Sequence, residues 1–323
     1  RVNKKEPTNS DSKAFIKPTL LLSDPDLVSY MTKFPNPKNR KIMLRDPSHA
    51  TQKLVHIFLL NRKICKTVDK ENPVHDTSTI FTLDISNTIV QKDVILNSRC
   101  KISVQKKGNI FVICALCIAS LDTAVSQYHI ILGKVAVLSF GNATQGGGGV
   151  VSGCNAQEEN INRLTNLFSH LTDDEVNRNF YAVNSYIKKF IPRLLYTSGV
   201  VQIMKDSPNY EVLDPKDRKK IDIITAAAPK LAPNIAPTKE ETEQLSNMVR
   251  LILEAAKTKG VDTLVLGAFG CGVYNWPPKL VVNIFENLLI NEKYRYYFNN
   301  IIFAIPTANY TFQVFKKLDK HEY

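Results

Sequence analysis

The sequence predicts an α/β fold, in which helices cover the faces of a sheet, preceded by an N-terminal helical extension. Two observations predict it. Short apolar and β-branched segments alternate with longer amphipathic segments through the second half of the chain, a rhythm typical of α/β sheets. Two glycine clusters closely follow predicted strands, where open α/β sheets place their ligand-binding loops. The 323 residues, 44% hydrophobic and 22% charged, can build a substantial core.

The first 75 residues are predicted to form a basic, helical extension, and residues 76–323 the main domain. Residues 1–13 are polar and rich in lysine, which favours a loose arm. Residues 50–60 are amphipathic and follow Asp46-Pro47-Ser48, a helix start signal. A helix is therefore expected there.

The main domain is predicted to begin with one or two strands within residues 77–90, where β-branched residues alternate. A long helical stretch is expected from Gln157, with Lys188, Lys189 and Arg193 on one solvated helix face. The apolar runs and amphipathic segments predict further strands at residues 109–118, 135–140, 221–226, 263–266 and 300–305, and helices at residues 240–259 and 279–290.

The net charge of +12 is concentrated near the N-terminus, where the first 70 residues hold 15 Lys and Arg against 6 Asp and Glu. Such a surface attracts polyanions, which could be nucleic acid, an acidic lipid or a phosphate-rich polymer, although a solvated, solubilising face is the commoner explanation. The longest apolar run, residues 110–119, is about half the length of a membrane-spanning helix. We therefore expect no membrane span, and we expect a monomer.

The six cysteines are sparse and mostly stand among apolar neighbours, as buried thiols do in a reducing compartment. An intracellular location, the cytoplasm or the nucleus, is therefore expected. Cys114 and Cys117 form a CxxC pair without a second pair or a nearby histidine. Its apolar flanks favour core packing over zinc or redox chemistry, so we expect no metal and no cofactor.

The two glycine clusters lie at residues 146–149 and 267–272. Backbone without side chains can approach a phosphate and offer it N–H donors, so two such loops suit a pyrophosphate. Each cluster alone could be only a tight turn with positive φ. Neither cluster fits the dinucleotide-binding or the P-loop pattern, which disfavours nicotinamide cofactors and P-loop phosphoryl transfer.

Two acidic residues begin the helix that follows the first glycine cluster. Glu158 and Glu159 directly follow Gln157, and seven residues separate Gln157 from Gly149. Acids in a first helical turn are favoured by the helix dipole and are usually surface residues. Beside a loop shaped for an anion, however, carboxylates repel the ligand unless one of them is used as an acid, which points to a function.

These segments resemble the catalytic signature of the microbial-type poly(ADP-ribose) glycohydrolases, in which GGG is followed after a few residues by QEE within a macrodomain fold. The resemblance covers roughly residues 80–315 and implies a macrodomain-like mixed sheet flanked by helices. The signature runs from Asn142 to Glu159, and supporting segments occur in the expected order at residues 121–124, 137–140, 224–229, 264–274 and 303–305.

The resemblance implies an enzyme that hydrolyses O-glycosidic linkages of ADP-ribose, in poly(ADP-ribose) or in ADP-ribosylated protein, and releases ADP-ribose. Glu159 would be the catalytic acid/base, Glu158 would hold the ribose, and Gln157 would support the loop. The remaining contacts to the diphosphate and the distal ribose would come from Asn142, Gly147, Gly148 and Gly149 of the first loop, and from Phe269, Gly270, Cys271, Gly272, Val273 and Tyr274 of the opposing loop.

Two other functions stay open from the sequence. A macrodomain reader would bind ADP-ribose without turnover, although it has no need of both Glu158 and Glu159. A nucleic-acid-associated protein would depend on the basic N-terminal region instead. Trp276 suits either stacking on the ligand or anchoring a packed loop. Cys154, Tyr274 and Trp276 differ from the common family pattern, and the type of leaving group is therefore left open.

Overall fold

The computed structural model describes residues 25, 49–74, 77–83, 89–92, 107–114, 133–187, 189–206, 210–306 and 309–320. These residues form an eight-stranded sheet with the order β2-β1-β5-β6-β4-β7-β8-β3. The strands are β1 (Ser78–Leu83), β2 (Ile89–Lys92), β3 (Asn109–Cys114), β4 (Val135–Phe140), β5 (Arg193–Val201), β6 (Lys220–Ala226), β7 (Thr263–Leu266) and β8 (Asn300–Ile305).

The sheet is mixed. From β6 through β4, β7 and β8 to β3, all neighbouring strands are parallel, whereas β5, β1 and β2 are added antiparallel to one edge. The predicted fold class, an α/β sheet of the macrodomain type, is confirmed. Because the parallel strands run in one direction, the loops that follow β4, β6 and β7 meet at a single edge.

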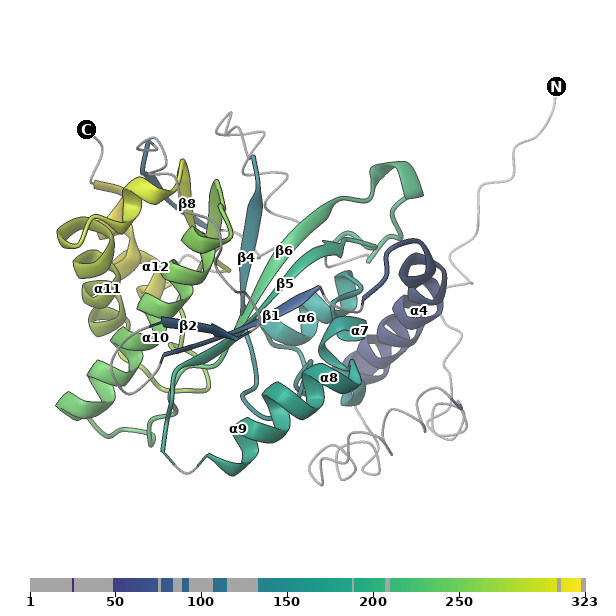
Figure 1. Cartoon of the computed structure of the whole chain (residues 1–323), viewed down its shortest axis with the longest axis horizontal. Helices are drawn as coiled ribbons and strands as arrows, with labels where there is room; N and C mark the ends of the chain where they lie inside the picture. Colours follow the sequence, from purple (N-terminus) through teal and green to yellow (C-terminus); the bar gives the residue numbers. More distant parts are fainter. Residues whose placement is uncertain are drawn as a thin grey trace.

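Helices cover both faces of the sheet (Figure 1). None of those within the described residues is long and apolar enough to cross a membrane. On one face lie α10 (Lys239–Thr258), α11 (Pro278–Glu286) and α12 (Tyr310–Phe315), and on the other lie α4 (His49–Glu71), α6 (Gln157–Leu164), α7 (Leu167–Leu171), α8 (Asp174–Val176) and α9 (Ala182–Tyr186).

The two faces have separate hydrophobic cores because side chains alternate along each strand. In β4, Ala136 and Leu138 pack with residues of α10 and α11. Val135 and Val137 pack with residues of α4, α6 and α7 on the other face. The central strands are thus apolar on both sides, which is why their sequences read as continuous apolar runs rather than as alternating ones.

The prediction of one long helical stretch from Gln157 is wrong. The helix α6 ends at Leu164, short helical turns continue to Tyr186, and β5 begins at Arg193. The chain enters the sheet there because β5 lies between β1 and β6, where Leu194, Leu195 and Tyr196 are all buried.

The basic residues before β5 therefore do not share a helix face, contrary to the prediction. Arg193 is the first residue of a strand, Lys189 lies in the connection before it, and Lys188 falls outside the described residues. The strand expected at residues 109–118 is found as β3, which ends at Cys114. Residues 115–118, which include Cys117, also fall outside the described part of the chain.

The helix predicted at residues 50–60 is found as α4, and it continues to Glu71. It packs on the segment that follows the first glycine cluster. Phe58 is fully buried and meets Phe168 edge to face, with 5.0 Å between ring centroids. Asn61 Nδ2 donates to the carbonyl oxygens of Arg163 and Thr165, both at 2.9 Å. The domain boundary at residue 75 stays a prediction.

Candidate active site

Two glycine-containing loops follow neighbouring parallel strands at the same edge of the sheet. Residues 141–156, called here the first glycine loop, connect β4 to α6, and residues 267–277, the second glycine loop, connect β7 to α11. Since β4 and β7 are paired, the two loops stand side by side at the carboxyl ends of their strands. This is the usual position of a ligand site in an open α/β sheet.

The first glycine loop curls over the two glutamates that start α6. Gly147 and Gly148 have φ of 75° and 54°, in the left-handed region that favours glycine. A Cβ on Gly148 would lie 2.6 Å from Glu159 Oε1 and 2.8 Å from Glu158 Oε2. Both carboxyl groups therefore lie directly against this bare Cα, and any side chain at position 148 would displace them.

Backbone N–H groups hold both carboxyl groups in place. Glu158 accepts from Asn142 N at 2.8 Å and from Gly147 N at 3.1 Å. Glu159 accepts from Gly149 N at 2.8 Å and from Ala156 N at 3.2 Å. Only 4% of Glu158 and 8% of Glu159 is exposed. The pair therefore lies beneath the loop with fixed orientations instead of extending into solvent.

Burial raises the pKa of Glu158 well above its ordinary value, and the neighbouring charge of Glu159 raises it further. The hydrogen bonds from the N–H groups of Asn142 and Gly147 lower this pKa, but by less. Two adjacent buried carboxyl groups are not easily ionised together. The protonated form of Glu158 is therefore favoured, and this reduces the negative charge that an anionic ligand would meet here.

Gln157 fixes the start of α6 to the end of β4. Its Oε1 accepts from Phe140 N at 2.7 Å, and its Nε2 donates to Leu138 O at 2.6 Å. Both ends of the amide are thus used on the backbone of one strand. This placement agrees with the supporting role expected for Gln157, and it sets the position of the two glutamates that follow.

The N–H groups of Gly147, Gly148 and Gly149 are not available to a phosphate, contrary to the expectation that both glycine clusters would offer such donors. Gly147 N and Gly149 N donate to the glutamates, and Gly148 N donates to Gln145 O at 3.2 Å. The physical reason is the adjacent pair of carboxyl groups, which need these donors because they are buried.

The second glycine loop has the donors that the first one lacks. Within the described part of the chain, the N–H groups of Gly272, Val273 and Tyr274 form no hydrogen bond. Gly272 and Val273 are exposed, and a Cβ on Gly272 would meet no atom within 4 Å. Successive free N–H groups on an exposed loop suit an anion.

Buried residues anchor the second glycine loop from below. Trp276 is 1% exposed, its Nε1 donates to Pro229 O at 2.6 Å, and its ring lies against Gly270, whose φ is 80°. Trp276 is thus a loop anchor, not a stacking platform. Phe269 is also 1% exposed and packs on Phe140 at 5.8 Å between ring centroids. Its contact with a ligand stays a prediction.

Tyr274 connects the two loops. Its hydroxyl donates to Gly141 O at 3.4 Å, and burial together with the charges of Glu158 and Glu159 raises the pKa of Tyr274. The ring therefore lies near both glutamates, at the border between the loops. Its packing on a ribose stays a prediction.

Several residues that support the site were missed from the sequence. The side chain of Arg163 is fully buried and donates to Cys154 O at 2.8 Å, which ties down the segment before α6. Tyr181 is buried against Gly146. A Cβ on Gly153 would lie 2.6 Å from Thr51 O of α4, so the N-terminal helix backs the same loop. Only the position of Arg163, one helical turn after Glu159, was a signal in the sequence.

Residues 33–205, more than half of the chain, match the microbial-type poly(ADP-ribose) glycohydrolase catalytic domain. The chain belongs to this glycohydrolase family. Residues 217–285 match the macro domain. The family match begins before α4, and it includes the first glycine loop with Glu158 and Glu159.

Solved structures of glycohydrolases of this kind resemble the chain. A poly(ADP-ribose) glycohydrolase from Thermomonospora curvata is 22% identical, with a TM-score of 0.62 over 82% of this chain and 99% of that one. A poly(ADP-ribose) glycohydrolase from Deinococcus radiodurans in complex with ADP-ribose is 26% identical, with a TM-score of 0.55 over 65% of this chain and 83% of that one. No curated protein sequence matches the chain.

Proposed function

We propose that this chain hydrolyses O-glycosidic linkages of ADP-ribose, in poly(ADP-ribose) or in ADP-ribosylated protein, and releases ADP-ribose. One observation carries the proposal: two buried carboxyl groups, Glu158 and Glu159, are held by backbone N–H groups beneath Gly148 at the ligand-binding edge of the sheet. Membership of the glycohydrolase family and the ADP-ribose complex of the Deinococcus radiodurans relative support the same substrate class.

In this proposal the second glycine loop receives the diphosphate. The free N–H groups of Gly272, Val273 and Tyr274 are suited to phosphate oxygens. The distal ribose would then lie between this loop and the first glycine loop, near the ring of Tyr274. A protonated Glu158 would donate a hydrogen bond to a ribose hydroxyl, and its neutrality lowers the repulsion of the diphosphate.

Glu159 would act as the acid and then as the base. Glu159 would first take up a proton, and this proton passes to the leaving oxygen while the bond between this oxygen and the anomeric carbon breaks, which leaves an oxocarbenium-like ribose. A water molecule then adds its oxygen to the anomeric carbon, and its proton returns to Glu159. The products are ADP-ribose and the free hydroxyl or side chain of the leaving group.

The test compares Glu159→Gln with Glu243→Gln, a control at an exposed position on α10. With poly(ADP-ribose) on an automodified polymerase as substrate, Glu159→Gln is expected to lower the rate of ADP-ribose release by about 100-fold or more. Its affinity for ADP-ribose, measured by calorimetry, should stay close to that of the wild type. If the wild type binds ADP-ribose but releases none from any conjugate, the chain is a reader and not a hydrolase.

A further inference from the structure

The exposed face of α4 carries a row of basic residues. Lys53, His56, Lys63 and Lys70 are all exposed and follow one another at intervals of three or seven residues. Residues at these intervals share one face of an α-helix. Lys66 is also exposed and lies about one turn beyond Lys63. These residues are called here the basic stripe.

The acidic residues of α4 leave this positive charge largely uncompensated. Asp69 is directed inward, where its carboxyl group accepts a hydrogen bond from Ser169 Oγ at 2.5 Å. Glu71, at the end of the helix, is the other acid of α4. Within the described part of the chain, Lys63 and Lys70 form no ion pair. The basic stripe therefore presents positive charge to solvent along the helix.

The segment before β6 extends this positive surface. Residues 216–220 hold four basic residues and one acidic residue, and all of them except Arg218 are exposed. Arg218 lies beside α4. Burial raises the pKa of the Cys65 thiol to about 12, and the nearby charge of Arg218 acts in the opposite direction. Within the described residues the guanidinium of Arg218 forms no hydrogen bond or ion pair.

The helix α4 connects the active-site edge of the sheet to the opposite edge. Near its start, Thr51 O lies 2.6 Å from the position of a Cβ on Gly153, so α4 begins against the first glycine loop. In its second half, Val68 packs in the same core as Ile221, near the start of β6. Because β6 ends at the active-site edge, its start marks the opposite edge. Figure 1 shows α4 as one continuous helix at the outer side of the molecule, next to α6 and α7.

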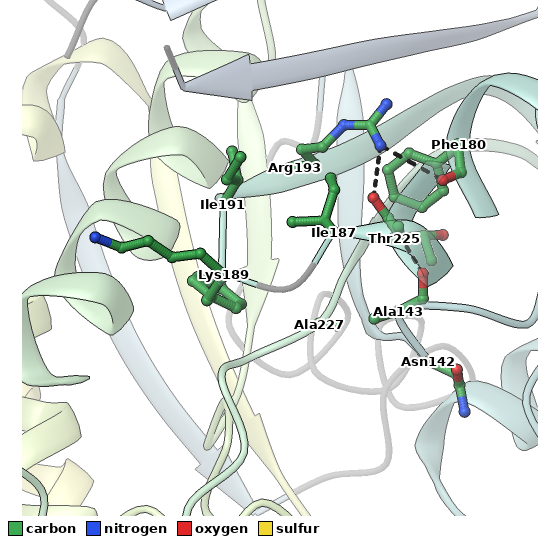
Figure 2. Close-up of a pocket in the computed structure, with 11 residues that line it drawn as sticks. Asn142, Ala143, Phe180, Ile187, Lys189, Ile191, Arg193, Thr225 and Ala227 are labelled. Atoms are coloured by element: carbon green, nitrogen blue, oxygen red, sulfur yellow. Dashed lines mark hydrogen bonds between the residues drawn. The ribbon is translucent and has the colours of Figure 1, made fainter. Parts of the chain in front are cut away.

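The basic stripe is separate from the cavity at the active-site edge. This cavity, of about 280 Å³, lies beside Asn142 and Ala143 of the first glycine loop (Figure 2). No residue of α4 or of the segment 216–220 lines it. The stripe instead spreads its charges over about 26 Å from Lys53 to Lys70, at about 1.5 Å per residue. A row of charges of this length is matched by a linear polyanion and not by one small anion.

We propose that the basic stripe binds the phosphates of a poly(ADP-ribose) chain while the end of the same chain occupies the active site. This inference rests on the proposed function. Each ADP-ribose unit carries a diphosphate, so the polymer offers negative charge at regular intervals. Because α4 begins against the first glycine loop, one flexible chain can reach both the stripe and the catalytic glutamates. A nucleic acid would match the charge equally well, but no part of it would occupy the active site.

The side chains of the stripe suit contacts to phosphates more than contacts to bases. A lysine ammonium is a point charge that binds phosphate without reading the group attached to it. The one phenylalanine of α4, Phe58, is buried, so the helix exposes no Phe, Tyr or Trp ring on which a base could stack. Binding should therefore depend on the charge and length of the polymer and weaken as salt rises.

The test replaces Lys63 and Lys70 together by Gln or by Glu. Glutamine forms helices about as well as lysine, so Lys63→Gln/Lys70→Gln removes charge and keeps the helix. The matched controls carry the same changes at Lys107 and Lys293, which are exposed and, within the described residues, form no ion pair. All variants are made in the Glu159→Gln background, so that the polymer stays intact. Titrations at several salt concentrations give the dissociation constants of poly(ADP-ribose), of ADP-ribose and of a DNA duplex with the same number of phosphates.

We expect Lys63→Gln/Lys70→Gln to weaken polymer binding about tenfold at low salt, and Lys63→Glu/Lys70→Glu to weaken it further. The slope of log Kd against log salt concentration should fall by about 2, since each lost phosphate contact lowers it by about 1. The affinity for ADP-ribose and the free energy of unfolding should stay close to the values of the parent protein. Polymer affinities equal to those of the parent protein, or an equal loss in the control variants, would overturn the inference.

Two further comparisons separate this inference from its alternatives. A loss of affinity for the DNA duplex alone would assign the stripe to a nucleic acid and overturn the proposal. With Glu159 intact, Lys63→Gln/Lys70→Gln should lower kcat/KM about tenfold for ADP-ribose release from long polymer, and leave it unchanged for a mono-ADP-ribosylated protein. If the polymer binds through the stripe but neither substrate is cleaved, the proposed hydrolysis fails and the binding surface stands.

Discussion

The two glycine loops have similar compositions and opposite hydrogen-bonding states. In the first glycine loop, Gly147 and Gly149 donate their N–H groups to Glu158 and Glu159, and Gly148 donates to a carbonyl oxygen of the same loop. In the second, Gly272 and Val273 are exposed and their N–H groups form no hydrogen bond within the described residues. One loop holds acids, and the other is free to hold an anion.

A glycine cluster therefore does not by itself indicate a phosphate site. Glycine serves two purposes here: at Gly148 it makes room for two carboxyl groups, and at Gly272 it exposes the backbone. The neighbouring acids decide which purpose applies, since buried carboxyl groups take the nearest donors. Three predictions, of decreasing expected effect, test this difference between the loops.

The largest effect is expected from Gly148→Ala. The new Cβ would stand within 3 Å of both carboxyl groups at a φ of 54°, so the glutamates must move. Because a misplacement of about 1 Å can cost about 100-fold in rate, we expect kcat for ADP-ribose release to fall by about that factor. Steady-state kinetics with poly(ADP-ribose) provide the measurement.

Gly260→Ala is the matched control for backbone strain. Gly260 has a φ of 68°, but a Cβ there meets no atom within 4 Å. It should lower the free energy of unfolding by about 1 kcal/mol, as a left-handed alanine does, and leave kcat unaltered. If both variants lose the same activity, the contact between Gly148 and the carboxyl groups does not matter for catalysis.

A smaller effect is expected from Val273→Pro in the second glycine loop. Proline removes the N–H donor, and a hydrogen bond to a charged group contributes about 1.5–3 kcal/mol. We therefore expect ADP-ribose to bind roughly tenfold more weakly or worse, as measured by calorimetry. Val273→Ala keeps the donor and removes only a side chain that is 77% exposed. Equal affinities of the two variants would contradict an anion site at this position.

Much of the fold could be predicted because the signals are local. The strands β4, β6, β7 and β8 are short apolar runs, and α10 begins with a capping box between Thr238 and Glu241. The strand β5 was missed because its buried residues follow a series of short helical turns and cover both faces of the sheet. Its place depends on pairing with β1 and β6, which are distant in sequence.

The sequence predicted which residues form the site, but it did not predict their hydrogen bonds. The spacing of the glycines and acids predicted that Glu158 and Glu159 lie beside the first glycine loop. In the structure both side chains accept hydrogen bonds from this loop. The acids take those N–H groups because both are buried. The loop that supplies the N–H groups is backed by α4 at Gly153 and by Tyr181 at Gly146, contacts that no local pattern reveals. For the same reason Arg193, which begins β5 and is half-buried, was interpreted as part of a solvated helix face.

The smallest effect concerns the charge state of Glu158 and is a change in stability. Burial raises the pKa of Glu158 above its ordinary value of 4.5, so the native state keeps a proton that the unfolded chain releases. The bound proton stabilises the native state fully at pH values below 4.5. This stabilisation is lost as pH rises through the raised pKa, by at most about 1.4 kcal/mol per pH unit. Glu158→Gln removes the titrating group. Its free energy of unfolding relative to wild type should therefore rise by about 1 kcal/mol or more between about pH 5 and about pH 8, as measured by urea denaturation, with Glu243→Gln parallel to wild type. If the free energy of unfolding of Glu158→Gln followed the same pH dependence as that of the wild type, Glu158 would be ionised beneath the first glycine loop. The two loops would then differ in how their N–H groups are arranged and not in the charge that they meet.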